Sequence, residues 1–260
     1  MIKNWLVKPA VAIFLAASFH AAGCSGDISP VAQGEYAVKQ VIDGDTIRLS
    51  NGSDVRYIGI DAPETMKRAG SGWIFSPEEK GVAAKEFNRM AVGGKTVRLE
   101  FDHERSDKYG RLLAYVHQNG RLVNMELVRQ GLAMVYTFPP NLKYYEEFIR
   151  AQDKARSEKL GIWNDLVEVP PDGVVGLEGR FCVVRGLVTG TGSYRSRVYL
   201  YFGKDRRKTL AAVINRRNLN LFSRDRIDPL TRYKGKFVEV VGKIEDNGGP
   251  VMIIDNPSQI

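Results

Sequence analysis

Three short strand-like segments follow one another near the N-terminal end of the chain, and they limit the folds that it can adopt. Their sequences are YAVKQVI (36–42), DTIRL (45–49) and DVRYIGI (54–60), rich in β-branched residues. The short connections between them contain Asp, Asn, Ser and Gly, which favour tight turns. Consecutive strands joined so closely pair antiparallel, so we expect a β-meander.

Strands and helices alternate after this meander. We expect an irregular loop at 65–76, a helix at 77–91 with Pro77 in its first turn, strands at 95–101 and 111–123, and helices at 124–130 and 142–159. Three strands, a helix, two strands and further helices form the order of a five-stranded OB-type barrel with capping helices.

A second group of strand-like segments repeats this order near the C-terminus. The predicted fold is therefore mainly β (α+β), an OB barrel followed by a second small OB-like barrel. The expected divisions are a signal peptide (1–23), a tether (24–34), the first barrel (35–165), a linker (166–179) and a basic second barrel (180–260).

The first 23 residues are typical of an export signal. Lys3 and Lys8 precede an apolar run at 11–17, and no acidic residue occurs before Asp27. This N-terminal segment leads into HAAGC at residues 20–24, where small residues before Cys24 favour lipidation of that cysteine. Simple cleavage nearby is the alternative. We expect an exported, membrane-anchored monomer in the cell envelope. The other cysteine, Cys182, lies in an apolar strand and is expected to be buried and inert.

Positive charge is concentrated at the C-terminal end. The chain carries a net charge of +8, but residues 174–260 hold 16 basic and 8 acidic side chains, whereas 24–173 hold 20 and 22. A polyanionic partner is attracted to the C-terminal region first. There, basic residues alternate with Tyr194, Tyr199 and Tyr201, a mixture that favours single-stranded nucleic acid. A solvated basic face that packs on other surfaces is the alternative.

Acidic residues carry the chemistry of the first barrel. The histidines lack metal-ligand spacing, and no P-loop, GxSxG or dinucleotide-binding pattern occurs. Asp45 begins one predicted strand and Asp61 ends the next, so the two carboxylates can meet around a hard cation such as Ca²⁺. Asp43-Gly44-Asp45 taken alone is better explained as a simple turn. Arg56 lies five residues before Asp61, which on an ideal strand puts them on opposite faces; a bulge near Gly59 would change this, and spacing does not decide between the two.

Five motifs in a fixed order extend this interpretation. They are VIDGDTIRL, VRYIGIDAPE, DKYGRLLAYV, LVRQGLAMV and KLGIW, within about 36–165. Together they resemble the staphylococcal-nuclease-like (thermonuclease) family, whose fold is an OB barrel with helices. The resemblance implies an endonuclease that hydrolyses phosphodiester bonds of DNA or RNA, releases the 5′-oxygen and leaves 3′-phosphate products.

The resemblance also implies roles for individual residues. By this resemblance Ca²⁺ is bound by Asp45, Asp61 and the Ala62 carbonyl, with Asp43 in support. Glu64 acts as the general base, and Arg56 and Arg111 bind the phosphate. The nucleotide is contacted by Lys108, Tyr109 and Tyr136. Guanidinium groups suit this chemistry because their planar forks bind phosphate oxygens in pairs. A rival interpretation is a non-catalytic envelope lipoprotein that binds nucleic acid or protein on the same fold.

Overall fold

The computed structural model describes residues 34–69, 72–76, 78, 80–224 and 228–260. Residues from Gln33 to Ile260 pack as one compact unit. The predicted signal peptide, nearly all of the tether and the lipidation site Cys24 lie outside the described residues. In the described part of the chain, no helix has both the length and the apolarity to cross a membrane.

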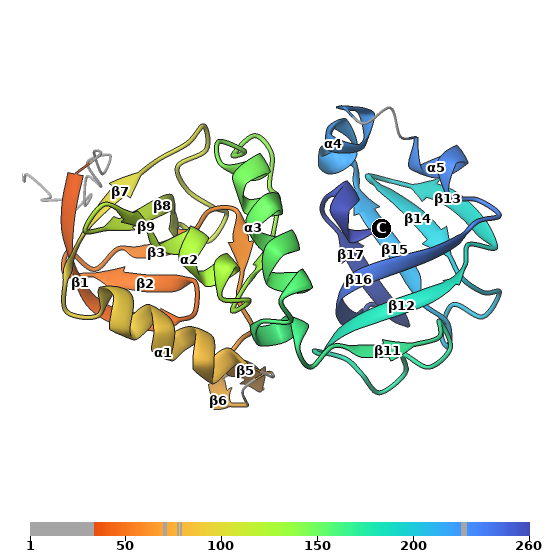
Figure 1. Ribbon diagram of the computed structural model, residues 1–260, viewed down its shortest axis with the longest axis horizontal. Coiled ribbons are helices and arrows are strands. Elements are labelled where there is room, and N and C mark those ends of the chain that lie inside the picture. Colours follow the sequence, from red (N-terminus) through yellow and green to blue (C-terminus); the bar gives the residue numbers. More distant parts are fainter. Residues whose placement is uncertain (1–33, 70–71, 77, 79, 225–227) are drawn as a thin grey trace, which may run out of the picture. The chain divides into compact units, whose positions relative to one another are not determined.

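Five strands close into a barrel in the first half of the chain (Figure 1). They are β1 (Gly34–Asp43), β2 (Thr46–Leu49), β3 (Asp54–Tyr57), β7 (Thr96–Glu100) and β8 (Leu112–Gln118). Neighbours pair antiparallel, and a parallel pairing of β3 with β8 closes the ring. The predicted OB-like barrel in a mainly β fold is confirmed.

Three helices accompany this barrel, namely α1 (Gly81–Val92), α2 (Val123–Arg129) and α3 (Tyr145–Ser157). The prediction that the first helix begins at residue 77 is wrong. The amide of Glu78 donates to the carbonyl of Glu64 at 2.7 Å, and Ser76 donates to Thr65 at 3.2 Å. These residues pair with the neighbouring segment, so the helix begins only at Gly81.

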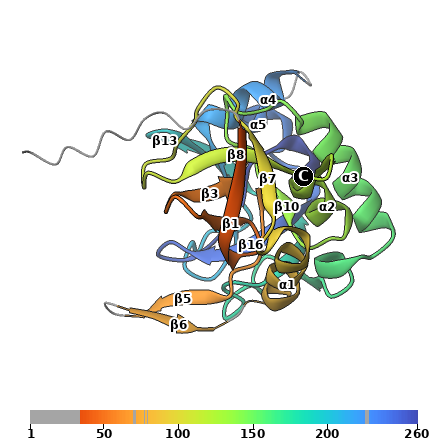
Figure 2. The same cartoon turned by 90° about the vertical axis from the view of Figure 1, so that its left-hand side faces the viewer.

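The segment at 65–76, predicted to be an irregular loop, contains an antiparallel hairpin instead. Its strands are β5 (Met66–Ala69) and β6 (Gly72–Phe75), shown in Figure 2. Two short strands, β4 (Ile60–Asp61) and β10 (Met134–Val135), pair antiparallel beside the barrel, and β9 (Arg121–Leu122) follows β8. The β4–β10 pair places Asp61 next to the chain that carries Tyr136.

A seven-stranded sheet forms the second half (Figure 1), and we call it the second sheet. Its order is β11 (Val167–Val169), β12 (Phe181–Leu187), β16 (Phe237–Asp246), β17 (Pro250–Ile254), β15 (Ala211–Asn215), β14 (Arg197–Tyr201) and β13 (Gly190–Tyr194). The short helix η1 (Gly161–Trp163) follows α3 in the first half, and four short helices accompany the second sheet in the described chain: η2 (Arg216–Asn218), α4 (Leu219–Arg224), α5 (Pro229–Arg232) and η3 (Pro257–Gln259). Cys182 is fully buried in its core, as predicted.

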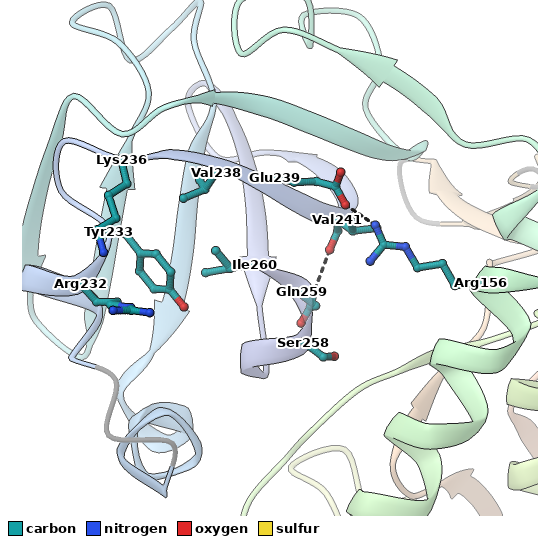
Figure 3. Close-up of a pocket in the computed structure, with 10 residues that line it drawn as sticks. All are labelled: Arg156, Arg232, Tyr233, Lys236, Val238, Glu239, Val241, Ser258, Gln259 and Ile260. Carbon is teal, nitrogen blue, oxygen red and sulfur yellow. Dashed lines mark hydrogen bonds and ion pairs between the residues drawn. The ribbon is translucent and has the colours of Figure 1, made fainter.

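Strand β11 lies within the segment 166–179 that was predicted to be a linker, and it pairs in parallel with β12. A shared apolar cluster lies close by. Met134 and Trp163 from the first half pack with Val183 and Val241 of the second sheet. On the wall of the cavity in Figure 3, Arg156 of α3 also forms an ion pair with Glu239 of β16.

Candidate active site

Arg56 lies between two of the predicted carboxylates. Its Nη1 is 2.7 Å from Asp45 Oδ2, and its Nη2 is 2.5 Å from Asp61 Oδ1. Strand β3 ends at Tyr57, and Gly59 has a φ of 83°, so the chain turns before Asp61. The five-residue offset therefore does not separate Arg56 from Asp61, because they stand on different strands.

Asp43-Gly44-Asp45 is both a turn and part of the site. Asp45 accepts the amide of Ala62 at 2.7 Å and the hydroxyl of Thr46 at 2.9 Å. Asp43 accepts the amide of Thr65 at 3.1 Å. The two acids thus hold the segment 62–65 from both ends. Burial raises the pKa of the Asp45 carboxyl, and nearby Asp61 adds to this, whereas Arg56 opposes it.

Glu64 stands beside this cluster. Partial burial, a hydrogen bond with Asp43 and the charge of Asp45 together raise the pKa of Glu64 to about 8. Its own amide donates to Glu78 Oε2 at 3.1 Å. That second carboxylate fixes the backbone that carries Glu64, and it lies 3.4 Å from Lys243 Nζ in β16.

Arg111 precedes β8 and is positioned by the pairing of β3 with β8. Arg56 is aligned with Leu113 in this parallel pair, and Arg111 stands two residues before Leu113, just ahead of the strand. Its Nε and Nη2 are each 2.7 Å from Asp107 Oδ2. This ion pair orients the guanidinium, which has no hydrogen bond to Asp45, Asp61 or Glu64 in the described structure.

The predicted nucleotide contacts fall into two places. Lys108 Nζ lies 4.9 Å from the ring of Tyr109, which is 72% exposed. Tyr136 lies beside the Gly59 turn, to whose carbonyl its amide donates at 3.0 Å. Burial raises the pKa of the Tyr136 hydroxyl to about 12, so it remains a hydrogen-bond donor at neutral pH.

Phe138, two residues after Tyr136, is in contact with the second half of the chain. The guanidinium of Arg217 lies 4.0 Å from the centre of its ring. The adjacent Thr137 donates its hydroxyl to the carbonyl of Asp255 at 2.5 Å. The segment that carries Tyr136 is therefore held by residues of the second sheet and of η2.

A cavity of about 280 Å³ adjoins the candidate site, and sequence reasoning missed most of its lining. Asp61 and Tyr136 line it from the first half, together with Arg197, Lys243 and Asp255 from the second sheet and its end. Burial and the charge of Asp61 raise the pKa of Asp255 to about 8. No local pattern marks these three residues, because their neighbours are distant in sequence.

The donor chemistry around Asp45 and Asp61 fits a hard divalent cation. Their oxygens lie within 2.7 Å of one guanidinium, and two further acids, Asp43 and Glu64, stand beside them. Four carboxyl groups against Arg56 leave an excess of negative charge, and oxygen ligands of this kind suit Ca²⁺. Among the described residues, no three His, Cys, Asp or Glu side chains form a closed ligand cluster.

Known proteins resemble this region of the chain. The family described as staphylococcal nuclease homologue matches residues 54–165. That range includes Arg56, Asp61, Glu64 and Arg111, and it begins after Asp43 and Asp45. The second sheet, from β12 onward, lies outside the match.

Individual relatives agree with the family match. The chain is 43% identical over 132 residues to a thermonuclease of Staphylococcus intermedius, covering 49% of this chain and 75% of that protein. It is 36% identical over 145 residues to a thermonuclease of Staphylococcus hyicus, covering 54% and 82%. It is also 40% identical over 135 residues to the SPbeta prophage-derived endonuclease YokF of Bacillus subtilis, covering 50% of this chain but 44% of that protein.

Proposed function

This chain belongs to the family of staphylococcal nuclease homologues, and from that premise we propose that it is a Ca²⁺-dependent endonuclease. Its relatives are named thermonuclease and endonuclease, which supports phosphodiester hydrolysis as the reaction and nucleic acid as the substrate. The observation that carries the proposal is the Asp45–Arg56–Asp61 arrangement beside Glu64.

Phosphate binding falls to the two arginines. Arg56 lies in β3, and Arg111 immediately precedes β8, the strand that pairs with β3. A phosphodiester under attack gathers negative charge on its non-bridging oxygens, and paired guanidinium donors stabilise that charge more as it grows. Asp45 and Asp107 hold the two guanidinium groups in place before substrate arrives.

Glu64 activates water in this proposal. The ionised carboxylate, the form that prevails above its pKa of about 8, accepts a proton from the attacking water; the 5′-oxygen leaves and takes a proton from solvent, so the products carry a 3′-phosphate. Asp43 and Glu78 position Glu64 through its carboxyl group and its amide. Asp45, Asp61 and the carbonyl of Ala62 are the residues that would hold Ca²⁺, which supplies further charge stabilisation when bound. Lys108, Tyr109 and Tyr136 bind the nucleotide.

The cellular setting is part of the same proposal. The signal-like segment at 1–23 and the HAAGC sequence support export and lipidation at Cys24. The enzyme then acts as a monomer anchored to the membrane in the cell envelope.

A cleavage assay on the purified full chain tests the activity. We expect single-stranded and duplex DNA to be cleaved with Ca²⁺ and not with EGTA. Glu64→Gln should lower kcat by about 10²–10⁴-fold, the usual contribution of a general base. Glu86→Gln, at an exposed carboxylate on α1 that pairs with Arg89 at 2.6 Å, is the matched control and should leave kcat unchanged.

Two results would contradict the mechanism. Absence of cleavage with Ca²⁺ would favour a non-catalytic binding protein on the same fold. Equal rates for the parent and Glu64→Gln would remove Glu64 from the reaction while leaving the nuclease class intact.

A further inference from the structure

The second sheet has one face that is not used for its core. Val198 and Leu200 of β14 point into the large apolar core. The alternating residues of β14 therefore point to the opposite face. On that face Tyr199 and Tyr201 pack over a small layer formed by Ala211, Val213, Val251 and Ile253.

Cross-strand register arranges this face in rows. Tyr201 is aligned with Gly190 and Ala211, and Tyr199 with Gly192 and Val213. The third row holds Tyr194, Arg197 and Asn215. We call the residues Tyr194, Arg197, Tyr199, Tyr201, Arg206 and Asn215 the tyrosine face.

The neighbours of the two central residues, Tyr199 and Tyr201, are small, and both tyrosines are half-buried. Their cross-strand partners on the edge strand β13 are glycines, and a side chain at Gly192 would begin 3.4 Å from the Tyr201 ring. The Tyr199 and Tyr201 rings lie at 8° to each other with centroids 5.8 Å apart. Arg206 lies 4.4 Å from the centre of the Tyr201 ring, so positive charge accompanies the aromatic surface.

The tyrosine face is continuous with the candidate active site. Arg197 and Asn215 of its third row line the same cavity of about 280 Å³ as Asp61 and Tyr136. Lys243 lines that cavity too. The acids Asp61 and Glu245, which also line the cavity, lie near the positive charges of Lys243 and Arg197. An extended ligand that lies over Tyr201 and Tyr199 therefore reaches Asp61 without leaving the protein surface.

We propose that the tyrosine face binds single-stranded nucleic acid and leads it to Asp61 and Tyr136. Aromatic rings beside cations are the chemistry that holds unpaired bases and their phosphates. A base can stack on a tyrosine ring only when its own face is free of its duplex neighbours, so the ligand is an unpaired strand. The net charge near +8 of residues 174–260 suits a polyanion. The inference depends on the proposed nuclease function in one respect, namely that the strand is led to an active site.

Binding to the full chain carrying Glu64→Gln in EGTA tests this proposal without cleavage. The probes are a fluorescent 20-nucleotide single strand, as DNA and as RNA, and the matching 20-base-pair duplex. Tyr199→Leu with Tyr201→Leu keeps apolar cover over Val213 but removes both rings. We expect its Kd for the single strands to rise at least about tenfold, because each stacked base contributes about 5- to 150-fold. Duplex binding should change less than about threefold.

Two further variants separate ring loss from general damage. Phe237→Leu removes a ring that is 72% exposed on the same sheet but outside the tyrosine face, and its Kd should stay within about twofold. Arg197→Gln with Arg206→Gln keeps both rings. That variant should lower the slope of log Kd against log salt for single strands by about 1.4, or 0.7 per lost phosphate contact.

Activity distinguishes failure of this inference from failure of the proposed function. With Glu64 restored, the tyrosine double variant should cleave a dinucleotide at the parental rate and a 20-nucleotide strand with a KM raised at least about tenfold. Unchanged single-strand Kd and KM in that variant, with a parent that cleaves, would overturn the inference alone. A parent that binds through the rings but cleaves nothing would overturn only the nuclease.

Discussion

Arg56 is the residue on which the local geometry of the site depends. Its two Nη atoms reach carboxylates on opposite sides of a turn, Asp45 at 2.7 Å and Asp61 at 2.5 Å. The residue types and their motif order predicted these candidates, and the structure brings all three together. Strand parity alone did not predict the contact, because the break in the strand at Gly59 is a backbone feature that alternation does not record.

Asp255 shows the other limit at the scale of residues. It follows an apolar strand in the sequence, and nothing nearby indicates that Asp61 of the first barrel affects its charge. Its side chain accepts from Asn218 at 3.1 Å, and its carbonyl accepts from Thr137. Such residues are found only when two halves that are distant in sequence are placed together.

The raised pKa of Asp255 predicts a stability that falls with rising pH. Burial, Asp61 and Glu245 raise it from 3.8 to about 8, against Asn218 and Arg217. The folded state then binds the proton that the unfolded state releases above pH 4. Stability is therefore lost as pH rises from about 4 to about 8, at up to about 1.4 kcal/mol per pH unit. Asp255→Asn keeps the acceptor for Asn218 and should flatten this dependence.

Urea unfolding in EGTA between pH 5 and pH 9 measures this effect. The gain in stability of Asp255→Asn over the parent should be larger at pH 8 than at pH 5. A gain that is the same at every pH would show that Asp255 titrates normally. Asp246→Asn, an exposed acid at the end of β16, serves as the control.

Elements were predictable where side-chain alternation or periodicity was strong. The five barrel strands and the helices at 123–129 and 145–157 lie close to their predicted positions. The hairpin β5–β6 was missed because its strands, MKRA and GWIF, are short and lie on either side of Gly70 and Ser71, residue types that are typical of a loop. The start of α1 was misplaced because pairing with Glu64, a contact outside the helix, takes the amide of Glu78.

The turn between β3 and β4 gives a prediction at the scale of elements. Gly59 has a φ of 83°, and a Cβ there would lie 2.5 Å from the ring of Phe148. Gly59→Ala should therefore add backbone strain and a steric clash with Phe148 together. We expect the free energy of unfolding, measured in urea, to fall by about 3 kcal/mol or more. Because the turn places Asp61, kcat should fall as well.

Gly52 provides the matched control for this change. Its φ is 91°, but no atom lies within 4 Å of a Cβ built there. Gly52→Ala should cost only the strain, about 1–2 kcal/mol, and leave kcat unchanged. Equal losses of stability in the two variants would show that Phe148 moves aside.

At the scale of the whole molecule, the two halves are joined by packing that no local pattern encodes. Trp163 is buried in the cluster that contains Met134 and Val241. Lys243 and Glu78, which are 3.4 Å apart, are separated by 165 positions. The sequence indicated two strand-rich regions, but contacts at such separations leave no periodic trace in it.

This packing predicts a single cooperative unfolding transition for the described unit. Since Trp163 contacts both halves, its fluorescence should report the same urea midpoint as far-UV circular dichroism. Val241→Ala should lower both midpoints together by an amount equivalent to about 1–3 kcal/mol. Two separated midpoints, with only one moved by Val241→Ala, would mean that the halves unfold independently. Trp163→Phe identifies which part of the fluorescence signal comes from this position.

Two contacts affect how this nuclease could be shortened. The hydroxyl of Thr137 donates to the carbonyl of Asp255, and Arg217 lies over the ring of Phe138. The family match ends at residue 165, which suggests a cassette that can be cut out and fused elsewhere. The wall of the cavity beside Asp61 and Tyr136, however, includes residues more than thirty positions beyond that cut, and the contacts to Thr137 and Phe138 come from residues more than fifty positions beyond it. A fragment that ends at residue 165 would keep the acids and arginines of the site. It would lose the contacts from Asp255 and Arg217 that hold the segment next to Tyr136.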